Sequence, residues 1–383
     1  MVQLGIEVLL TDRMELIRGK AIGLVTNYTM TDSHYRPVID LLAENREWQL
    51  KKLFGPEHGV QNAAKEGEHV HSGIDSNTGL PVFSLYGETR KPTSEMLSAL
   101  DAIVMDLQDI GSRYYTNMNT VYYCMEACAA LGLPCIILDR PNPINGVTRE
   151  GIILESEFRS FVGLHLIPNR HGLTMGELAQ FFNQNLKPQC DLTVVETRGW
   201  LRTQLLSETN LPFVPSSPNT TNLDMCLLYP GTCFFEGVNV SLGRGTTHPF
   251  EVVGAPYIDG HRLSDWFNAQ KLPGVVSRPT YFTPTYSQYT GELCKGIQLH
   301  VIDSKNLESV RTGVTLLQGI HDLFPNLFEF IKGAEGRPLF IDLLAGTDEL
   351  RRLVEEGEGL RYLTESREGV ERFTREIKDF ELY

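Results

Sequence analysis

The first 145 residues alternate short apolar runs with segments of helical spacing. Apolar runs rich in β-branched and aromatic residues predict strands at 21–27, 48–55, 81–87, 102–111 and 134–143. Apolar positions three and four residues apart predict helices at 35–45, 93–100 and 120–132. Near-continuous apolar strands separated by helices are typical of a mostly parallel sheet that is covered on both faces. The pattern therefore predicts a Rossmann-like, doubly wound α/β domain.

The second half of the chain has a less regular pattern. A capping box from Thr174 to Glu177 opens a predicted helix at 171–184, so Glu177 is read as a helix cap rather than a catalyst. Strands are predicted at 191–197 and 295–303, and a charged amphipathic helix at 342–359. These elements predict a C-terminal α/β (α+β) domain. The boundary is placed so that the domains span 1–150 and 151–383.

Polar side chains follow each of the predicted strands of the first domain. They are Thr26, Asn27 and Tyr28, then Glu57 and His58, then Tyr86, then Asp106, Gln108 and Asp109, and finally Asp139, Arg140 and Asn142. Ligands of open α/β sheets bind beyond the carboxyl ends of the strands. We therefore expect Glu57, His58, Asp106, Asp109 and Arg140 to border one concave site at this edge.

The composition narrows the function classes. The chain has 383 residues, a net charge of -14 and a pI of about 5.2, which disfavours nucleic-acid binding because phosphate contacts need clustered Lys and Arg. No apolar run is long enough to span a membrane. The absence of a signal-peptide pattern after Met1 favours a cytoplasmic protein, or a secreted domain whose signal has been removed. Seven cysteines without a CxxC motif indicate reduced, buried thiols.

Several short motifs are weighed for chemistry. Glu57 lies between two glycines beside His58, in "LFGPEHG", where it could act as a general acid or base or merely belong to a polar turn. The "HVH" of His69 and His71 could bind a metal, although such a pair is more often an exposed strand or loop. Ser84 and Ser241 lack a nucleophile-elbow setting, and neither dinucleotide nor phosphate-loop motifs occur.

Seven blocks of the sequence, in order, resemble one known family. They are "LFGPEHG", "TGLPVFSLYG" with "RKPT" just after it, "DLQDIGSRYYT", "LDRPNPING", "RHGLTMGELA", "YPGTCFFEGVNVSLGRGTTHPFE" and "GAPY". The chain resembles the family once labelled DUF1343, whose characterised members are exo-β-N-acetylmuramidases of the NamZ type, glycoside hydrolase family 171. The resemblance implies a Rossmann-like N-terminal domain, a C-terminal α/β domain and an active site in the cleft between them.

The resemblance also implies a function. We expect a glycosidase that removes terminal N-acetylmuramic acid from the non-reducing end of peptidoglycan fragments, with Glu57 as the catalytic acid and His58 as its orienter or a substrate contact. The second catalytic group stays open among Asp106, Asp109 and Glu236, unless the substrate's acetamido group acts as the nucleophile. No cofactor or metal is implied, and a monomer or homodimer is expected.

Recognition of N-acetylmuramic acid calls for a cation, because its lactyl ether carries a carboxylate. Arginine can hold a carboxylate through two parallel hydrogen bonds. Arg244, in the Gly-rich "SLGRGTT" loop, is the first choice, followed by Arg140 and Arg113. The other expected substrate contacts are aromatic or polar: Tyr86, Tyr115, Asn142, Glu236 and Asn239.

Two other function classes remain open at this stage. A metallohydrolase would be centred on His58, His69 and His71, and chelation should abolish its activity. A two-domain sugar-binding protein would hold muramyl fragments without turnover. The placing of Glu57 and His58 together at a strand end favours an enzyme.

Overall fold

The computed structural model describes residues 2–333 and 336–383. Its N-terminal part holds a seven-stranded sheet in the order β3-β4-β2-β1-β5-β6-β7. All neighbours pair in parallel except β3, which runs antiparallel to β4. The strands are β1 (Ala21–Val25), β2 (Gln49–Gly55), β3 (Gly73–Ile74), β4 (Pro81–Ser84), β5 (Ala102–Met105), β6 (Cys135–Leu138) and β7 (Leu192–Val195). The predicted mostly parallel sheet is confirmed.

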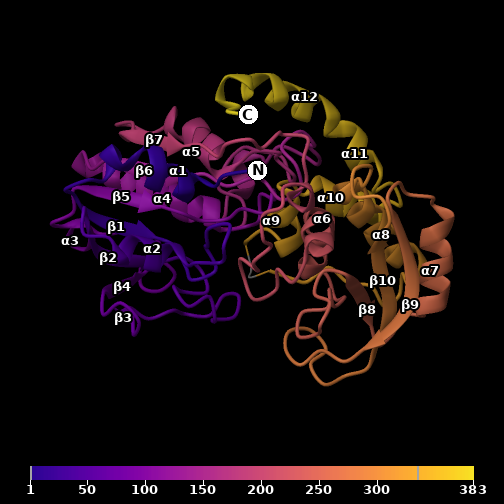
Figure 1. Cartoon of the computed structure of the whole chain (residues 1–383). Helices are drawn as coiled ribbons and strands as arrows, with labels where there is room; N and C mark the ends of the chain where they lie inside the picture. The colour runs from indigo at the N-terminus through magenta and orange to yellow at the C-terminus, as the bar shows by residue number, and fades with distance from the viewer. Residues whose placement is uncertain (1, 334–335) are drawn as a thin grey trace.

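Helices cover both faces of this sheet, as the continuous apolar strands predicted (Figure 1). Ala102 and Val104 of β5 pack into a core shared with α1 and α2, whereas Ile103 and Met105 pack into a core shared with α3, α4 and α5. Alternate residues of one strand thus serve opposite faces. These helices are α1 (Gly5–Asp12), α2 (Val38–Glu44), α3 (Ser94–Leu97), α4 (Asn117–Leu131) and α5 (Met175–Asn183).

The C-terminal part is built on a three-stranded antiparallel sheet in the order β8-β10-β9. Its strands are β8 (Val252–Ala255), β9 (Val275–Phe282) and β10 (Cys294–Val301), and its helices are α6 (Leu223–Thr232), α7 (Gly260–Ala269), α8 (Ser309–Leu323), α9 (Phe340–Ala345) and α10 (Glu349–Glu355). α6 and α8 cross closely, since a Cβ at Gly313 would lie 2.1 Å from the carbonyl oxygen of Gly231. The core of this part also takes in Ile110, Tyr114 and Tyr115, which follow β5.

The end of the chain returns to the N-terminal domain. α11 (Arg361–Glu365) and α12 (Arg367–Glu376) run across the top of the molecule from one domain to the other (Figure 1). Phe373 and Ile377 then pack into the same core as α5. The two domains are therefore joined by packing at both ends of the second domain.

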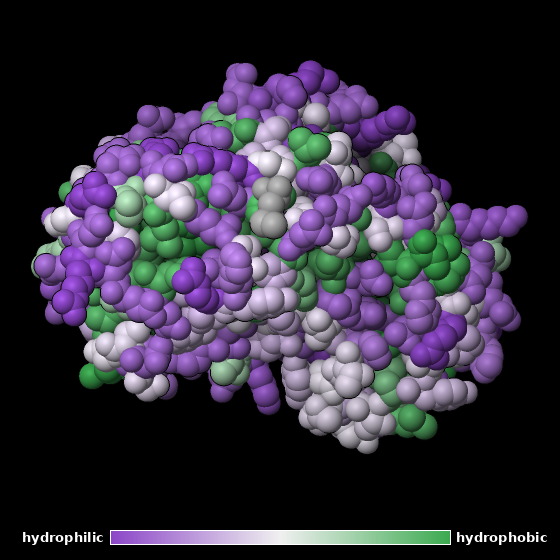
Figure 2. All heavy atoms as spheres, in the orientation of Figure 1, coloured by the Kyte–Doolittle hydropathy of each residue, from purple (hydrophilic) through white to green (hydrophobic). Residues whose placement is uncertain are grey.

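The surface is hydrophilic over most of the face in Figure 2, with apolar residues scattered among the polar ones. The outline is indented between the N-terminal domain and the lower part of the C-terminal domain (Figure 2). No helix within the described ranges has the length and apolar character needed to cross a membrane. All seven cysteines are buried and unpaired, as expected for reduced thiols.

The expected boundary at residue 150 lies between β6 and β7, which are neighbours in the first sheet. One detail differs from the pattern read in the sequence. The single helix predicted at 342–359 is wrong, because the segment forms α9 and α10 instead. Gly346 separates them in a left-handed conformation (φ 83°), which ends the first helix.

Candidate active site

The loop after β2 carries Glu57 and His58 at the carboxyl end of the parallel strands. His58 (φ 71°) and Gly59 (φ 77°) both adopt left-handed backbone conformations, which turn the chain sharply. The Nδ1–H of His58 donates to the carbonyl of Ala64 at 2.7 Å. A carbonyl can only accept, so this nitrogen carries the proton. His58 thereby fixes the shape of the loop that presents Glu57.

Three neighbours surround the Glu57 carboxylate. Its Oε2 accepts a hydrogen bond from the Thr116 hydroxyl at 2.5 Å, and its Oε1 accepts one from the backbone N–H of Gly67 at 3.2 Å. Tyr86 lies beside it, and burial together with the negative charge of Glu57 raises the pKa of Tyr86 to about 12. The phenol is therefore protonated at neutral pH. The sequence folds these groups together from three loops at one sheet edge.

A cavity of about 330 Å³ lies between the two domains, with Glu57 on its wall. This volume is at the lower end of the range for small-molecule sites. The N-terminal domain contributes Glu57, His58, Glu66, Tyr86, Thr116, Phe161 and Asn219 to the lining, and the C-terminal domain contributes Tyr229, Glu236, Arg244 and Phe250. Aromatic and apolar walls with a few carboxylates suit a single sugar ring.

Arg244 lines this cavity and pairs with one carboxylate from each domain. Its guanidinium lies 2.5 Å from Glu236 Oε1 and 3.2 Å from Glu66 Oε2. Burial opposes the charged form of Arg244, but Glu236 and Glu66 outweigh this effect and raise the pKa of Arg244 on balance. Glu66 also accepts a hydrogen bond from the Asn219 side chain at 3.3 Å. Arg244 is thus already committed to two carboxylates.

The structure brings only some of the expected residues to this cavity. Tyr86, Tyr115, Glu236 and Arg244 line it together with Glu57 and His58. Tyr115 shares a hydrogen bond of 2.6 Å with the hydroxyl of Ser216. Three other expected contacts lie outside the lining and bond elsewhere: Asn142 to the Leu173 carbonyl, Asn239 to the Leu327 carbonyl, and Arg113 to the carbonyls of Ile152, Ile167, Leu344 and Ala345. Arg113 is fully buried and ties the domains together.

The expectation of one shared site also fails geometrically for Asp106, Asp109 and Arg140. Arg140 forms a buried ion pair with Asp106 and donates to the Thr31 carbonyl at 2.9 Å. Asp109 accepts from the Gly111 N–H at 2.5 Å and lies 3.1 Å from the imidazole of His171. All three side chains are buried, and none lines the cavity around Glu57.

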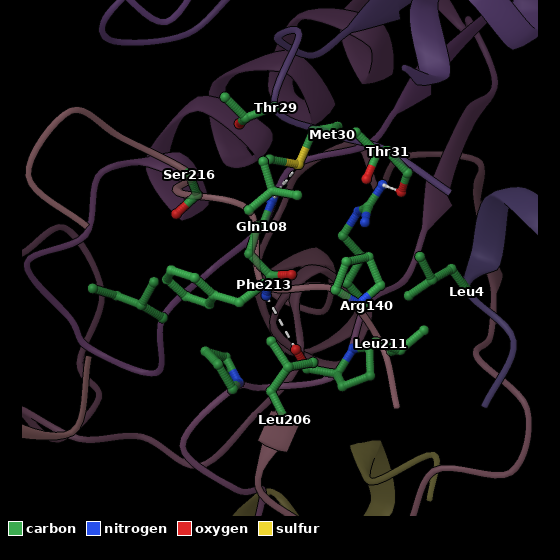
Figure 3. Close-up of a pocket in the computed structure, with 15 residues that line it drawn as sticks. Leu4, Thr29, Met30, Thr31, Gln108, Arg140, Leu206, Leu211, Phe213 and Ser216 are labelled. Carbon is green, nitrogen blue, oxygen red and sulfur yellow. Dashed lines mark hydrogen bonds between the residues drawn. The ribbon is translucent and has the colours of Figure 1, made fainter. Parts of the chain in front are cut away.

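The physical reason lies in the segment that leads into the second domain. β1 and β5 are the neighbours at which the strand order reverses, so a ligand crevice is expected at their carboxyl ends. Leu206, Leu211 and Phe213 pack over this place and face Arg140 across a small cavity (Figure 3). That cavity measures about 30 Å³, which is room for about one water molecule. The ligand space is therefore displaced towards the loops after β2 and β4.

Sequence reasoning missed several lining residues. Glu66, Thr116, Phe161 and Asn219 line the cavity, yet none follows directly from a predicted strand. Thr116 precedes α4 and Asn219 precedes α6, so each reaches the cavity through the packing of the domains. The weak signal available was that Thr116 ends the block "DLQDIGSRYYT".

The structure does not bring His58, His69 and His71 together as metal ligands. His69 and His71 are exposed, with ring centroids 5.0 Å apart, and neither lines the cavity that holds His58. Across residues 2–333 and 336–383, no group of three or more His, Cys, Asp and Glu side chains is arranged to hold a metal ion.

Comparisons with known proteins agree with this layout. The model of the exo-β-N-acetylmuramidase NamZ N-terminal domain matches residues 22–224, and that of the NamZ C-terminal domain matches residues 227–383. The chain is 44% identical over 383 residues to the peptidoglycan β-N-acetylmuramidase NamZ of Bacillus subtilis strain 168, covering 100% of this chain and 91% of that protein. The two family models meet within α6, beyond β7.

Two solved structures show the same fold over the whole chain. Both are DUF1343 family proteins of Bacteroides fragilis NCTC 9343, with TM-scores of 0.92 and 0.80 and sequence identities of 36% and 31%. Each comparison covers 100% of this chain and 99% of the other. With matching models over both domains and a full-length relative, the chain belongs to the NamZ family of exo-β-N-acetylmuramidases.

Proposed function

We propose that this protein is an exo-acting glycoside hydrolase that releases terminal N-acetylmuramic acid from the non-reducing end of peptidoglycan fragments. One observation carries the proposal: in a member of this family, Glu57 lies on the wall of a cavity of about 330 Å³ between the domains. A small cavity suits one terminal sugar better than the middle of a long glycan. The named Bacillus subtilis relative acts on the same polymer.

Glu57 is proposed as the general acid. In its protonated form it donates a proton to the glycosidic oxygen while the bond between that oxygen and the anomeric carbon breaks. A water molecule adds to the anomeric carbon and gives up a proton, which restores the acid. Thr116 and the Gly67 N–H hold the two carboxyl oxygens of Glu57 in place. His58 supports this arrangement through its bond to Ala64.

The second catalytic carboxylate is proposed to be Glu236. Asp106 and Asp109, the other sequence candidates, are buried in bonds outside the cavity. Glu236 lines it 2.5 Å from Arg244, where its carboxylate would stabilise a positively charged transition state or activate a water. Retained hydrolysis in a Glu236→Gln variant would instead indicate that the substrate's acetamido group takes this role.

Measurement of turnover distinguishes a glycoside hydrolase from a sugar-binding protein. The wild-type protein is incubated with a chromogenic β-glycoside of N-acetylmuramic acid across a broad pH range, and release of the chromophore and of the free sugar is measured. The proposal expects catalytic release of both. Stoichiometric binding of the sugar without release, in protein that is folded by circular dichroism, would contradict hydrolysis and favour the binding protein.

A further inference from the structure

The cavity is poorly suited to an anion unless a further cation serves it. N-acetylmuramic acid differs from N-acetylglucosamine by a lactyl ether, whose carboxylate is ionised at neutral pH. The lining includes three carboxylates, those of Glu57, Glu66 and Glu236, and one arginine, Arg244. The whole chain carries a net charge of -14, which adds to the repulsion at short range. Selective binding of this sugar therefore requires a positive group at the cavity.

The arginines first expected in this role are occupied. Arg244 is paired with Glu236 and Glu66, and only 12% of its side chain is exposed. Arg140 is paired with Asp106, and Arg113 is buried among backbone carbonyls. Using Arg244 for the substrate would mean breaking or sharing two ion pairs that connect the domains. An uncommitted cation is the better candidate.

Arg90 lies just outside the lining, against two aromatic rings that belong to it. It follows β4 in "GETRKPT", and its side chain is exposed. Its guanidinium carbon lies 3.8 Å from the ring centroid of Phe161 and 5.4 Å from that of Tyr86. Both rings line the cavity, and their centroids are 5.4 Å apart. Within the described ranges, no carboxylate lies within ion-pair distance of Arg90. Stacking leaves the hydrogen-bonding edge of a guanidinium free.

The neighbours of Tyr86 connect Arg90 with the reaction centre. Burial and the negative charge of Glu57 raise the pKa of Tyr86 to about 12, while the positive charge of Arg90 acts in the opposite direction. The Tyr86 phenol therefore lies close enough to both Glu57 and Arg90 for each charge to shift its pKa. Glu57 acts at the anomeric carbon in the proposed mechanism, and the lactyl group is attached two carbons further round the same ring. A carboxylate on that group needs a cation near Glu57 but separate from it.

We propose that Arg90 determines specificity by binding the lactyl carboxylate of the terminal N-acetylmuramic acid through a bidentate hydrogen-bonded ion pair, with Phe161 and Tyr86 holding its guanidinium at the cavity mouth. This inference rests on the proposed function. It assigns the contact to a residue outside the set of arginines expected from the sequence. Arg244 instead holds Glu66 and Glu236 in place.

The test compares two aryl β-glycosides that differ in charge alone, one of N-acetylmuramic acid and one of its lactyl N-methylamide. Wild type should prefer the acid by about 10- to 100-fold in kcat/KM, as one charge-assisted ion pair allows. Arg90→Ala should lose that preference by raising KM for the acid, with the amide nearly unchanged. Arg90→Lys should keep part of it. Arg262→Ala is the matched control, since Arg262 is also exposed and stacks on Phe324 at 5.8 Å, far from this lining.

A folded Arg90→Ala variant that keeps the wild-type preference for the acid would overturn the assignment. Equal cleavage of both glycosides by the wild type would also overturn it, because no residue would then recognise the lactyl carboxylate. A wild type that cleaves neither would contradict the proposed hydrolysis instead. In that case calorimetric titration with N-acetylmuramic acid and its N-methylamide still decides on Arg90: loss of preference for the acid in Arg90→Ala supports the contact, and retained preference overturns it.

Discussion

At the residue scale, two hydrogen bonds and one phenol define the setting of Glu57. Thr116 and Gly67 donate to separate carboxyl oxygens, so the carboxyl group has a fixed orientation towards the cavity. Thr116 is also a suitable position for substitution. It is the N-cap residue of α4 but makes no side-chain capping bond, so its hydroxyl can be removed without uncapping the helix.

Thr116→Val should lower kcat about tenfold, because the Thr116 bond strengthens as Glu57 gives up its proton, and a hydrogen bond to a charged group contributes about 1.5–3 kcal/mol. Steady-state kinetics on the chromogenic glycoside measures this change. Thr116→Ser, which keeps the hydroxyl, is the control and should stay within about twofold of wild type. Equal kinetics for the Val and Ser variants would show that the Thr116 contact does not orient Glu57.

Single residues could be predicted from the sequence only where strand ends and turn residues coincide. Glu57 was found because Gly and Pro mark a sharp turn directly after an apolar strand. Asp106 and Arg140 carry the same strand-end signal, yet they pair with each other beneath Leu206, Leu211 and Phe213. A distant segment decides whether a polar strand end is open or covered, and the local pattern does not contain that information.

At the element scale, the loop from 56 to 72 connects the two domains as well as presenting Glu57. Glu66 reaches Arg244 of the C-terminal domain and Asn219 just before α6, and its neighbour Gly67 donates to Glu57. Lys65 lies over the ring of Tyr286, 5.0 Å from its centroid. A shift of this loop would therefore also move the Glu57 carboxyl, through the bond from Gly67.

Glu66→Gln should loosen this loop, because the substitution removes the negative charge that Arg244 pairs with. We expect a loss of about tenfold in kcat, and faster hydrogen exchange of the amides in 56–72. Glu68→Gln is the control, since the Glu68 carboxylate accepts a bond from the Lys65 backbone within the same loop. Unchanged exchange and turnover in Glu66→Gln would mean that the interdomain pair plays no part in positioning Glu57.

The elements themselves were largely predictable. Buried parallel strands need apolar residues on both faces, and this produces the apolar runs that mark β1, β5 and β6. β9 was missed because Ser277, Arg278 and Pro279 interrupt its apolar residues, and a proline within a run argues against a strand. The tail helix was mistaken because the left-handed turn at Gly346 interrupts a pattern that otherwise continues.

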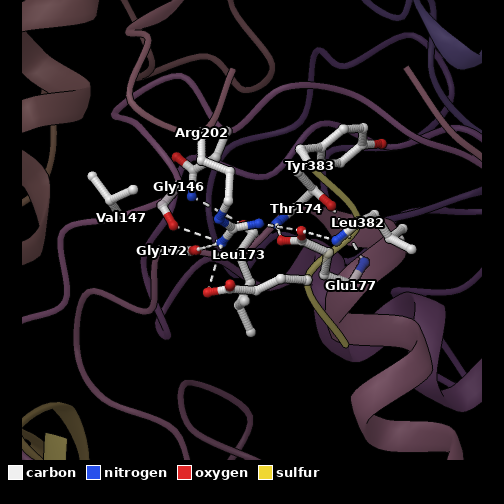
Figure 4. Close-up of polar contacts among 12 residues, drawn as sticks. Gly146, Val147, Gly172, Leu173, Thr174, Glu177, Arg202, Leu382 and Tyr383 are labelled. Carbon is white, nitrogen blue, oxygen red and sulfur yellow. Dashed lines mark hydrogen bonds and ion pairs between the residues drawn. The ribbon is translucent and has the colours of Figure 1, made fainter. Parts of the chain in front are cut away.

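At the scale of the whole molecule, the last residues anchor the second domain to the first. The Leu382 N–H donates to Glu177 Oε1 at 2.9 Å, beside the buried Arg202 (Figure 4). The Tyr383 hydroxyl donates to Asp139 at 2.6 Å, at the end of β6. Glu177 is both the predicted helix cap and part of this anchor. The C-terminal residues thus help to hold together the domains that enclose the cavity.

This anchor should make stability depend on pH. Burial is the largest influence on Asp139 and raises its pKa from 3.8 to about 6, despite hydrogen bonds from Thr174 and Tyr383 that act in the opposite direction. The folded protein therefore keeps a proton at pH values where the unfolded chain has lost it. The stabilisation is complete below about pH 4 and is lost as the pH rises through about 6.

Asp139→Asn should remove that dependence. Between about pH 4 and pH 6 the free energy of unfolding of wild type should fall by up to about 3 kcal/mol relative to the variant. Urea unfolding across this range measures the difference. Asp191→Asn, at an exposed position, should follow wild type. Parallel profiles for wild type and Asp139→Asn would show that Asp139 ionises no less readily in the folded state than in the unfolded chain.

The role of Glu57 as general acid is tested most directly by how the loss of kcat in Glu57→Gln depends on the leaving group. A general acid contributes about 10²–10⁴-fold in rate where the departing oxygen needs a proton, and little where it leaves easily. We predict that Glu57→Gln loses that factor in kcat on a muramyl disaccharide but much less on an activated aryl glycoside of N-acetylmuramic acid. Glu196→Gln, an exposed glutamate outside the cavity, should behave as wild type on both. Equal losses on the two substrates, or none on the disaccharide, would contradict Glu57 as the acid.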